Sequence, residues 1–304
     1  MGVLGAFVFA AQMINFTIPG TGSSGHLGGG LLLAILLGPH AAFLAIASVL
    51  GVQALFFADG GLLALGCNIF NMGVFPCFIA YPLIYKKIVG PDPSPGRLLS
   101  GSLPAAIVGL QLGALGVVLE TAFSGISVLP LPSFLMLMQP IHLAIGIVEG
   151  LVTAGVVTFI WNSQPEILKR TAADQPLGQL PLGKILAVLI LATVVTGGFL
   201  AWFASEHPDG LEWSMLHVSG QEELEPPASG IHASLGHLQK KTAIMPDYAF
   251  KKKTGDNEAA TNQKTAAGRA KLGTSAAGLT GGLLVMVLGL LIGFVLKNRG
   301  HSPT

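Results

Sequence analysis

The chain has 304 residues, of which 51% are hydrophobic and only 10% carry a formal charge. Soluble domains carry roughly 25% charged residues, so this composition excludes an ordinary soluble protein and indicates a membrane protein. The net charge of +1 gives no sign of a nucleic-acid partner, and none is predicted.

Apolar runs along the chain predict an all-α polytopic membrane protein with about eight transmembrane helices. A helix needs about 20 residues to cross some 30 Å of hydrocarbon. The second run is too short for this, and Gly38-Pro39 separates it from the third, so these two are predicted to form a tight helical hairpin. The runs are Met1–Ile18, Leu27–Leu37, His40–Phe57, Leu62–Ile88, Leu103–Phe123, Ser133–Trp161, Ile185–Ala204 and Ala276–Leu296.

Among the short loops, lysine and arginine occur only in alternate ones, which predicts the orientation of the chain in a cell (inner) membrane. The loops at 19–26, 58–61 and 124–132 contain neither residue. By the positive-inside rule these loops face outward and the amino terminus is cytoplasmic. The basic residues of the opposite side are Lys86, Lys87, Arg97, Lys169, Arg170, Lys184, Lys297 and Arg299.

A long polar segment divides the chain into units. Residues 1–161 form a six-span unit, 162–184 a cytoplasmic linker, and 185–304 a two-span unit with an external loop at 205–273. Long loops cross the membrane largely regardless of their charge, so an external position is allowed. The Ala, Lys, Thr and Gly content of Gly255–Gly273 is typical of a disordered segment.

Two glycine-rich segments resemble nucleotide-binding motifs but lack the required context. Gly20–Gly25 fits G-x-G-x-x-G, yet it follows a membrane span rather than a strand. Gly178–Lys184 resembles a P-loop, yet Ile185 stands where Ser or Thr should bind magnesium. The sequence therefore predicts a non-enzymatic protein, and any ATP-driven role requires a partner subunit.

Polar side chains within the spans gather at one depth. Counting 1.5 Å per residue from the external helix ends places them in the outer half of the membrane. Glu149 is deeper, on the same helix face as His142. Intramembrane polar residues usually mark a site, so the set predicts an outward-facing cavity, although hydrogen bonds between neighbouring helices are an alternative. The outer-half residues are Gln12, Asn15, Gln53, Asn68, Asn71, Glu120 and His142.

The chemistry of this set favours a d-block metal over a hard cation. It contains amides and few charges, which does not suit a carboxylate cage for calcium or magnesium. His26 lies in the glycine-dense external segment Ser23–Gly30, where glycines allow the backbone to bring an imidazole over the cavity. Imidazole favours nickel, cobalt, copper or zinc. His26 is therefore the candidate metal ligand, with an ordinary loop histidine as the alternative.

Several segments together resemble the M-type substrate-specific component of nickel/cobalt energy-coupling-factor (ECF) transporters, which is CbiM/NikM-like. They are Ala10–Phe16, Ser24–Leu27, Ala58–Gly61 and Asn68–Met72, in the order of that family. Pro208–Glu212 and Met245–Tyr248 are similar to the PDGLE module of the accompanying N-type component. The resemblance covers nearly the whole chain and implies that the two components are fused here.

The resemblance implies a ligand set and partners. In that family, Ni²⁺ or Co²⁺ is held by nitrogens of an amino-terminal Met-His and by the histidine of the Ser-Gly-His loop, which corresponds to His26. No resident cofactor is expected. A membrane coupling (T) subunit and cytosolic ATPase subunits would drive release. The groups expected to hold the ligands in place are Asn68, Asn71, Gln53, His142 and Asp59.

The sequence begins Met1-Gly2 rather than Met-His, so we expect an upstream segment of about one span. A proton-coupled secondary transporter that uses Glu149 and His142 as a relay is one alternative. A membrane scaffold with a vestigial cavity is another. The sequence does not separate nickel from cobalt, because both metals take the same nitrogens.

Overall fold

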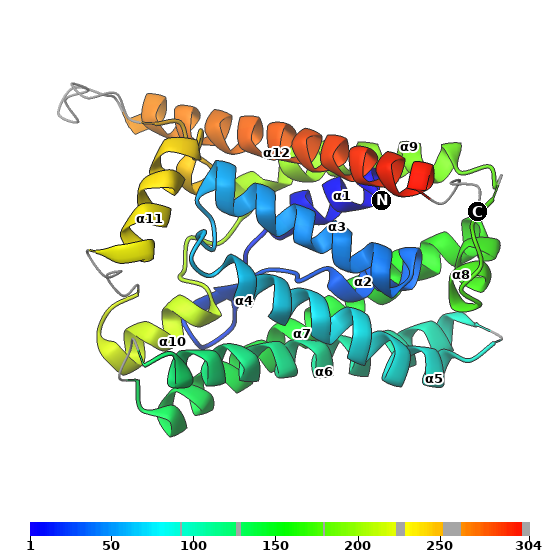
Figure 1. The fold of residues 1–304 in the computed structure, drawn as a ribbon, viewed down its shortest axis with the longest axis horizontal. Coiled ribbons are helices and arrows are strands. Elements are labelled where there is room, and N and C mark those ends of the chain that lie inside the picture. Colours follow the sequence, from blue (N-terminus) through cyan, green and yellow to red (C-terminus); the bar gives the residue numbers. More distant parts are fainter. Residues whose placement is uncertain (92, 126–128, 179, 223–228, 252–262, 300–304) are drawn as a thin grey trace.

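The computed structural model describes all residues except 92, 126–128, 179, 223–228, 252–262 and 300–304. Its helices run side by side along the long axis of the molecule (Figure 1). The longest are α6 (Pro95–Ser124), α7 (Leu131–Ser163) and α12 (Gln263–Arg299). In chain order, the other elements are α1 (Gly2–Gln12), β1 (Phe16–Ile18), β2 (Ser23–Gly25), α2 (Gly30–Leu37), α3 (Pro39–Val52), the π-helical η1 (Gln53–Phe57), α4 (Leu65–Ile69), the π-helical η2 (Phe70–Tyr85), α5 (Lys86–Val89), α8 (Pro165–Ala172), α9 (Gly183–Gly198), the 3₁₀ turn η3 (Leu200–Phe203), α10 (Gly210–Ser219), α11 (Gly230–Thr242) and the 3₁₀ turn η4 (Pro246–Tyr248).

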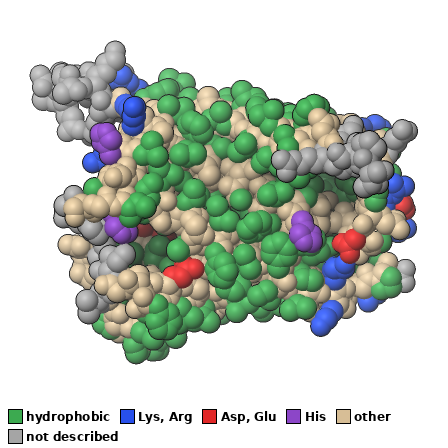
Figure 2. All heavy atoms as spheres, in the orientation of Figure 1, with side chains coloured by type: hydrophobic (Ala, Val, Ile, Leu, Met, Phe, Trp, Pro, Cys, Tyr) green, Lys and Arg blue, Asp and Glu red, His purple; other side chains and the backbone are tan. Residues whose placement is uncertain are grey.

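The prediction of an all-α polytopic membrane protein is confirmed. Within the described residues, five helical stretches are long and apolar enough to cross a bilayer. The surface between the two ends of the molecule is mainly hydrophobic, and charged side chains gather toward the ends (Figure 2). The helices α1 and α9 are apolar but shorter. The five stretches are Pro39–Phe57, Leu65–Val89, Pro95–Ser124, Leu131–Ser163 and Gly268–Leu296.

The prediction of a first helix over Met1–Ile18 is wrong at its carboxyl end. The helix α1 ends at Gln12, and Phe16–Ile18 forms a strand that pairs antiparallel with Ser23–Gly25. The β-branched Thr17 and Ile18 favour an extended backbone, and the Pro-Gly turn that follows ends the helical pattern. The strand pair is the start of the segment that carries His26.

The predicted helical hairpin at Gly38-Pro39 is confirmed. The helix α2 ends at Leu37, Gly38 has a φ of 79°, and Pro39 opens α3. All residues of α2 except its last are buried, although the helix has only 8 residues and so spans about 12 Å. This short helix therefore lies inside the protein, between the middle of the bundle and one end.

The helices α1 and α12 pack against each other through glycines. A Cβ atom on Gly2 of α1 would lie 2.4 Å from the carbonyl oxygen of Met286 in α12, and one on Gly289 would lie 2.8 Å from the Gly2 Cα atom. Such distances leave no room for a side chain, so the two helices meet backbone to backbone.

The last helix begins earlier than predicted. The helix α12 starts at Gln263, so 263–273 is helical rather than disordered as predicted from its composition, while 255–262 lies outside the described residues. The last helix of the prediction began only at Ala276. Alanine is the strongest helix former, which explains how a polar, alanine-rich segment extends an apolar helix.

The two ends of the bundle differ in charge. The helices α10 and α11 lie at one end, and α5 and α8 at the other (Figure 1). The second end carries Lys86 and Lys87 in α5 and Lys169 and Arg170 in α8. The helix α8 buries Ile167, Leu168 and Thr171 within the protein, whereas Lys169 is exposed and Glu166 and Arg170 are half-buried.

This arrangement predicts the accessibility of single cysteines. After replacement of Cys67 and Cys77, we expect Thr21→Cys and Ser124→Cys to react with an impermeant maleimide added outside intact cells. Arg97→Cys and Lys169→Cys should react only after the cells are opened, because the positive-inside rule predicts that the basic end faces the cytoplasm. Outside labelling of Arg97→Cys would invert the topology.

Candidate metal-binding site

A cavity of about 730 Å³ lies toward the end of the bundle that carries α10 and α11. All predicted site residues line it, and both units contribute to its wall. Of the outer-half polar residues, Glu120 is the one that does not line it. From 1–161 the polar lining residues are Gln12, Asn15, His26, Gln53, Asp59, Asn68, Asn71 and His142; from 185–304 they are Ser205, Glu206, Asp209, Glu212, Asp247, Tyr248, Lys271 and Thr274.

The backbone that follows His26 is held by buried side chains. Gly28 N donates to Glu149 Oε2 at 2.7 Å, and Gly29 N donates to Glu149 Oε1 at 3.1 Å. The Gly28 carbonyl accepts from Gln12 Nε2 at 2.9 Å, and Gln12 Oε1 accepts from Gln53 Nε2 at 3.0 Å. Gln53 therefore acts on the loop through Gln12 rather than by touching His26.

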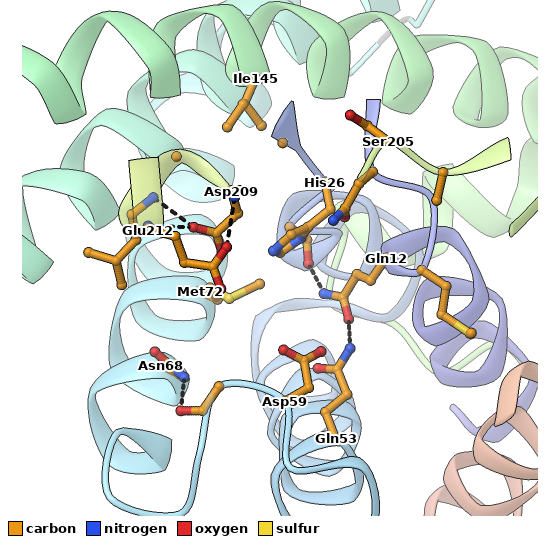
Figure 3. A pocket seen from close by; sticks show the side chains of 18 of the residues that line it. Gln12, His26, Gln53, Asp59, Asn68, Met72, Ile145, Ser205, Asp209 and Glu212 are labelled. Carbon is orange, nitrogen blue, oxygen red and sulfur yellow. Dashed lines mark hydrogen bonds between the residues drawn. The ribbon is translucent and has the colours of Figure 1, made fainter. Parts of the chain in front are cut away.

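His26 presents one nitrogen to the cavity. It is half-buried, and its Nδ1 atom lies 3.1 Å from the Leu27 carbonyl oxygen. A carbonyl oxygen only accepts, so in the neutral ring Nδ1 carries the proton and Nε2 keeps its lone pair, the form that a metal requires. Figure 3 shows the ring directed into the space between Gln12, Met72 and Asp209.

Asn68 and Asp59 organise a second loop at the cavity. Asn68 Nδ2 donates to the Gly60 carbonyl at 3.3 Å. The Tyr248 hydroxyl donates to Asp59 Oδ2, and the Tyr248 ring stacks on Phe57 with centroids 5.0 Å apart. Burial and the adjacent Asp59 carboxylate raise the pKa of the Tyr248 phenol, so it stays a proton donor. Tyr248, from residues 185–304, thus holds a loop of residues 1–161 in place.

Asn71 and His142 are anchored to their own surroundings. Asn71 Nδ2 donates to Glu120 Oε2 at 2.8 Å, which explains the place of Glu120 behind the cavity wall. His142 Nδ1 lies 2.8 Å from the Met138 carbonyl, which leaves its Nε2 lone pair free by the same reasoning as for His26. That these residues support a metal ligand stays a prediction.

The PDGLE-like segment Pro208–Glu212 builds the start of α10. Asp209 Oδ1 accepts from Leu211 N at 2.8 Å and Glu212 N at 2.9 Å, while Glu212 Oε2 accepts from Asp209 N at 3.0 Å. This is a capping box, and the Asp-x-x-Glu spacing in the sequence is its signature. The Pro208 carbonyl accepts from Ser24 N at 2.8 Å, so the segment is also bonded to the Ser-Gly-His loop.

Sequence reasoning missed that residues of the external loop complete the cavity. Asp209 and Glu212 lie across the space from Gln12 and His26 (Figure 3). The capping-box spacing could have located the start of α10, but not its position against α7. That position depends on contacts between segments far apart in the sequence.

The electrostatics of the cavity favour cations. Five carboxylates and one ammonium group lie in its wall. A cleft lined mainly by one sign of charge raises the local concentration of the opposite ion. The carboxylates are Asp59, Glu206, Asp209, Glu212 and Asp247, and the ammonium belongs to Lys271, which lies over the Trp202 ring.

The described residues do not form a complete coordination sphere. Among them, no group of three or more His, Cys, Asp or Glu side chains is placed to hold a metal ion. What the cavity offers instead is imidazole nitrogen on a fixed loop within an acidic wall. This arrangement can contribute one nitrogen ligand to a metal ion whose other ligands come from outside this group of side chains.

The packing of α10 predicts the effect of a methyl group at Gly210. A Cβ atom there would lie 2.7 Å from Ile141 Cγ2 and 3.1 Å from His142 Cε1. We expect Gly210→Ala to weaken docking of α10 by about 1–3 kcal/mol, the usual cost of overpacking, seen as faster amide hydrogen exchange in α10. The control is Gly236→Ala in α11, where a Cβ atom meets nothing within 4 Å. Equal exchange in both variants would refute the tight contact.

Comparison with known proteins identifies the family. The model of the cobalt uptake substrate-specific transmembrane region (CbiM) matches residues 1–167, and the PDGLE domain matches 183–298. The putative fused nickel transport protein NikMN of Archaeoglobus fulgidus is 38% identical over 195 residues, which cover 63% of this chain and 61% of that protein. This chain therefore spans less than two thirds of the length of that relative.

Two further relatives are also named as transport proteins rather than enzymes. A putative metal transport protein of Haloquadratum walsbyi is 39% identical over 170 residues, 55% of this chain and 74% of the relative. The probable fused nickel transport protein LarMN of Lactiplantibacillus plantarum is 33% identical over 265 residues, 82% of this chain and 76% of the relative. The chain belongs to the cobalt uptake substrate-specific transmembrane region family of metal transport proteins, fused to a PDGLE domain.

Proposed function

We propose that this protein captures Ni²⁺ or Co²⁺ outside the membrane, as the substrate-binding component of an ATP-dependent energy-coupling-factor transporter. The observation that carries the proposal is the placement of His26. Its imidazole enters an acidic cavity on a backbone fixed by Glu149 and Gln12. The nickel transport names of the relatives and the cobalt uptake family model support the same substrate class.

The donor chemistry supports a d-block metal. Imidazole nitrogen suits nickel and cobalt, whereas calcium and magnesium need several oxygen ligands in one place. The carboxylates Asp209 and Glu212 already accept backbone hydrogen bonds of the capping box. They therefore contribute negative charge to the cavity more readily than they form an oxygen cage.

The energy source is proposed to lie in partner subunits. No glycine-rich segment of this chain has the context of a nucleotide-binding motif, so ATP would be hydrolysed by cytosolic subunits. The resemblance to energy-coupling-factor transporters implies a membrane coupling protein between those subunits and this one. A proton-coupled carrier is less well supported, because both oxygens of Glu149 are engaged by backbone N–H groups.

The ligand role of His26 predicts a loss of metal binding on its removal. We expect His26→Ala to abolish saturable binding of Ni²⁺ or Co²⁺ in calorimetric titration, because the cavity loses its loop imidazole. Asn68→Ala should weaken binding roughly 10–100-fold, as expected for a group that holds a ligand in place. The matched control is His217→Ala, which changes an exposed histidine of α10 outside the cavity. Unchanged binding by His26→Ala would make His26 an ordinary loop histidine.

The proposed energy coupling predicts that this chain alone does not transport. Reconstituted by itself in liposomes, it should give no sustained Ni²⁺ or Co²⁺ entry under a proton gradient. Entry should appear only when coupling and ATPase subunits and ATP are present. Metal entry that follows the proton gradient without them would favour the secondary transporter. Absence of metal from the purified protein would favour the scaffold.

A further inference from the structure

The carboxylate of Glu149 is buried where the packing of α7 does not require a charge. The side chain is 3% exposed. On the same helix, Gly146 and Gly150 lie against the backbone of α6, where added Cβ atoms would come within 2.9 Å of Ile107 Cα and 2.7 Å of Leu103 Cα. The Glu149 carboxylate is bonded to Gly28 and Gly29 and takes no part in this contact, and burying a carboxylate is costly unless it is fully hydrogen-bonded. Glu149 therefore needs a role outside helix packing.

Its partners lie at the amino end of α2. This helix begins after Gly29, which has a φ of 75° and no side-chain cap of its own. Gly29 is the N-cap residue of α2 and Gly28 precedes it, so their N–H groups have no partner within the helix. Glu149 accepts both from α7, with one oxygen for Gly28 N and the other for Gly29 N.

The glycines of the loop fit this carboxylate. A Cβ atom on Gly28 would lie 3.0 Å from Glu149 Oε2, and one on Gly29 would lie 2.5 Å from Val8 Cγ1. Side chains at these positions would push the backbone away from α7 and α1. The close approach of backbone to carboxylate thus explains the glycines that follow His26.

The same peptide unit is fixed on its other side. The Gly28 carbonyl accepts from Gln12, so Gly28 is bonded through both its N–H and its C=O group. His26 lies two residues before Gly28. Two residues before His26, the backbone N–H of Ser24 donates to the Pro208 carbonyl. With the chain held on both sides, the direction of the imidazole is set.

We propose that Glu149 is the positioning residue of the metal-binding loop: its carboxylate binds the two backbone N–H groups just before α2 and thereby holds His26 in the orientation that binds metal. The inference rests on the proposed function, in which His26 is a ligand. It assigns to Glu149 no contact with the metal and no proton transfer.

The test uses two variants that alter the contact from opposite sides. Glu149→Gln keeps the shape but turns an amide donor toward one of the two backbone N–H groups. Gly28→Ala leaves the carboxylate intact and places a methyl group against Glu149 Oε2. The control is Thr153→Val, which replaces a buried hydroxyl one turn further along α7. Gly28→Ala alone decides the question if Glu149→Gln does not fold.

Three measurements on each folded, purified variant distinguish positioning from simple stabilisation. Without metal, hydrogen exchange of the peptide 24–30 should be at least about tenfold faster in both variants than in the control, because buried N–H groups lose their acceptor. With Co²⁺ or Ni²⁺ as the probe, affinity should fall roughly 10–100-fold. The ligand-field spectrum of the bound metal should also shift, which a change in fold stability alone would not cause.

The outcomes separate the two proposals. Unchanged exchange at 24–30 in a folded variant overturns the positioning role, whatever the metal affinity. Faster exchange with unchanged affinity and spectrum also overturns it, because the loop then moves without consequence for the metal. If the parent protein binds neither Co²⁺ nor Ni²⁺, the proposed function fails, and the exchange experiment still decides whether Glu149 holds the loop.

Discussion

Non-helical backbone at membrane depth is tolerated only where it is buried in protein or lines a water-filled cavity. Gly28 and Gly29 of the Ser-Gly-His loop are buried, so their backbone groups must find partners in the protein, and this constraint shapes the loop. Gly28 and Gly29 donate to Glu149, the Gly28 carbonyl accepts from Gln12, and Ser24 donates to the carbonyl of Pro208. The hydrogen bonds that hold the loop in its folded conformation are the same ones that orient His26.

The fused PDGLE domain supplies one of the hydrogen-bond partners of the Ser-Gly-His loop. The carbonyl that receives Ser24 belongs to the first residue of the PDGLE-like segment, and Gly210 of that segment packs directly on His142. At the opposite wall, Tyr248 bonds to Asp59. In the fused chain the second unit is therefore part of the cavity wall, and α1 meets α12 through glycines that allow close backbone contact.

The sequence predicted the positions of most helices but not the contacts between segments far apart in the chain. Apolar runs located most helices, because a span needs a minimum length of apolar residues whatever its neighbours are. The end of α1 was missed, because the apolar run continues into residues that pair as a strand. The depth of the polar residues along their helices correctly gathered Gln12, Asn68 and His142 at one cavity, although Glu120 of the same set lies outside its lining. The partners of Glu149 could not be predicted, since they lie 120 and 121 residues away and depend on how α2 packs against α7.

Attraction and selection of the cation fall to different residues. The carboxylates in the wall provide negative charge, but several of their oxygens are already engaged: Asp209 and Glu212 by the capping box, and Asp59 by Tyr248. A hard cation that needs many oxygen ligands is therefore attracted by the negative charge but does not meet enough free oxygens to coordinate it. A metal that accepts imidazole finds in His26 a nitrogen whose lone pair is free and whose direction is fixed. On the proposed function, selectivity for d-block metals rests on the engagement of three of the five carboxylates and on the free imidazole nitrogens of His26 and His142.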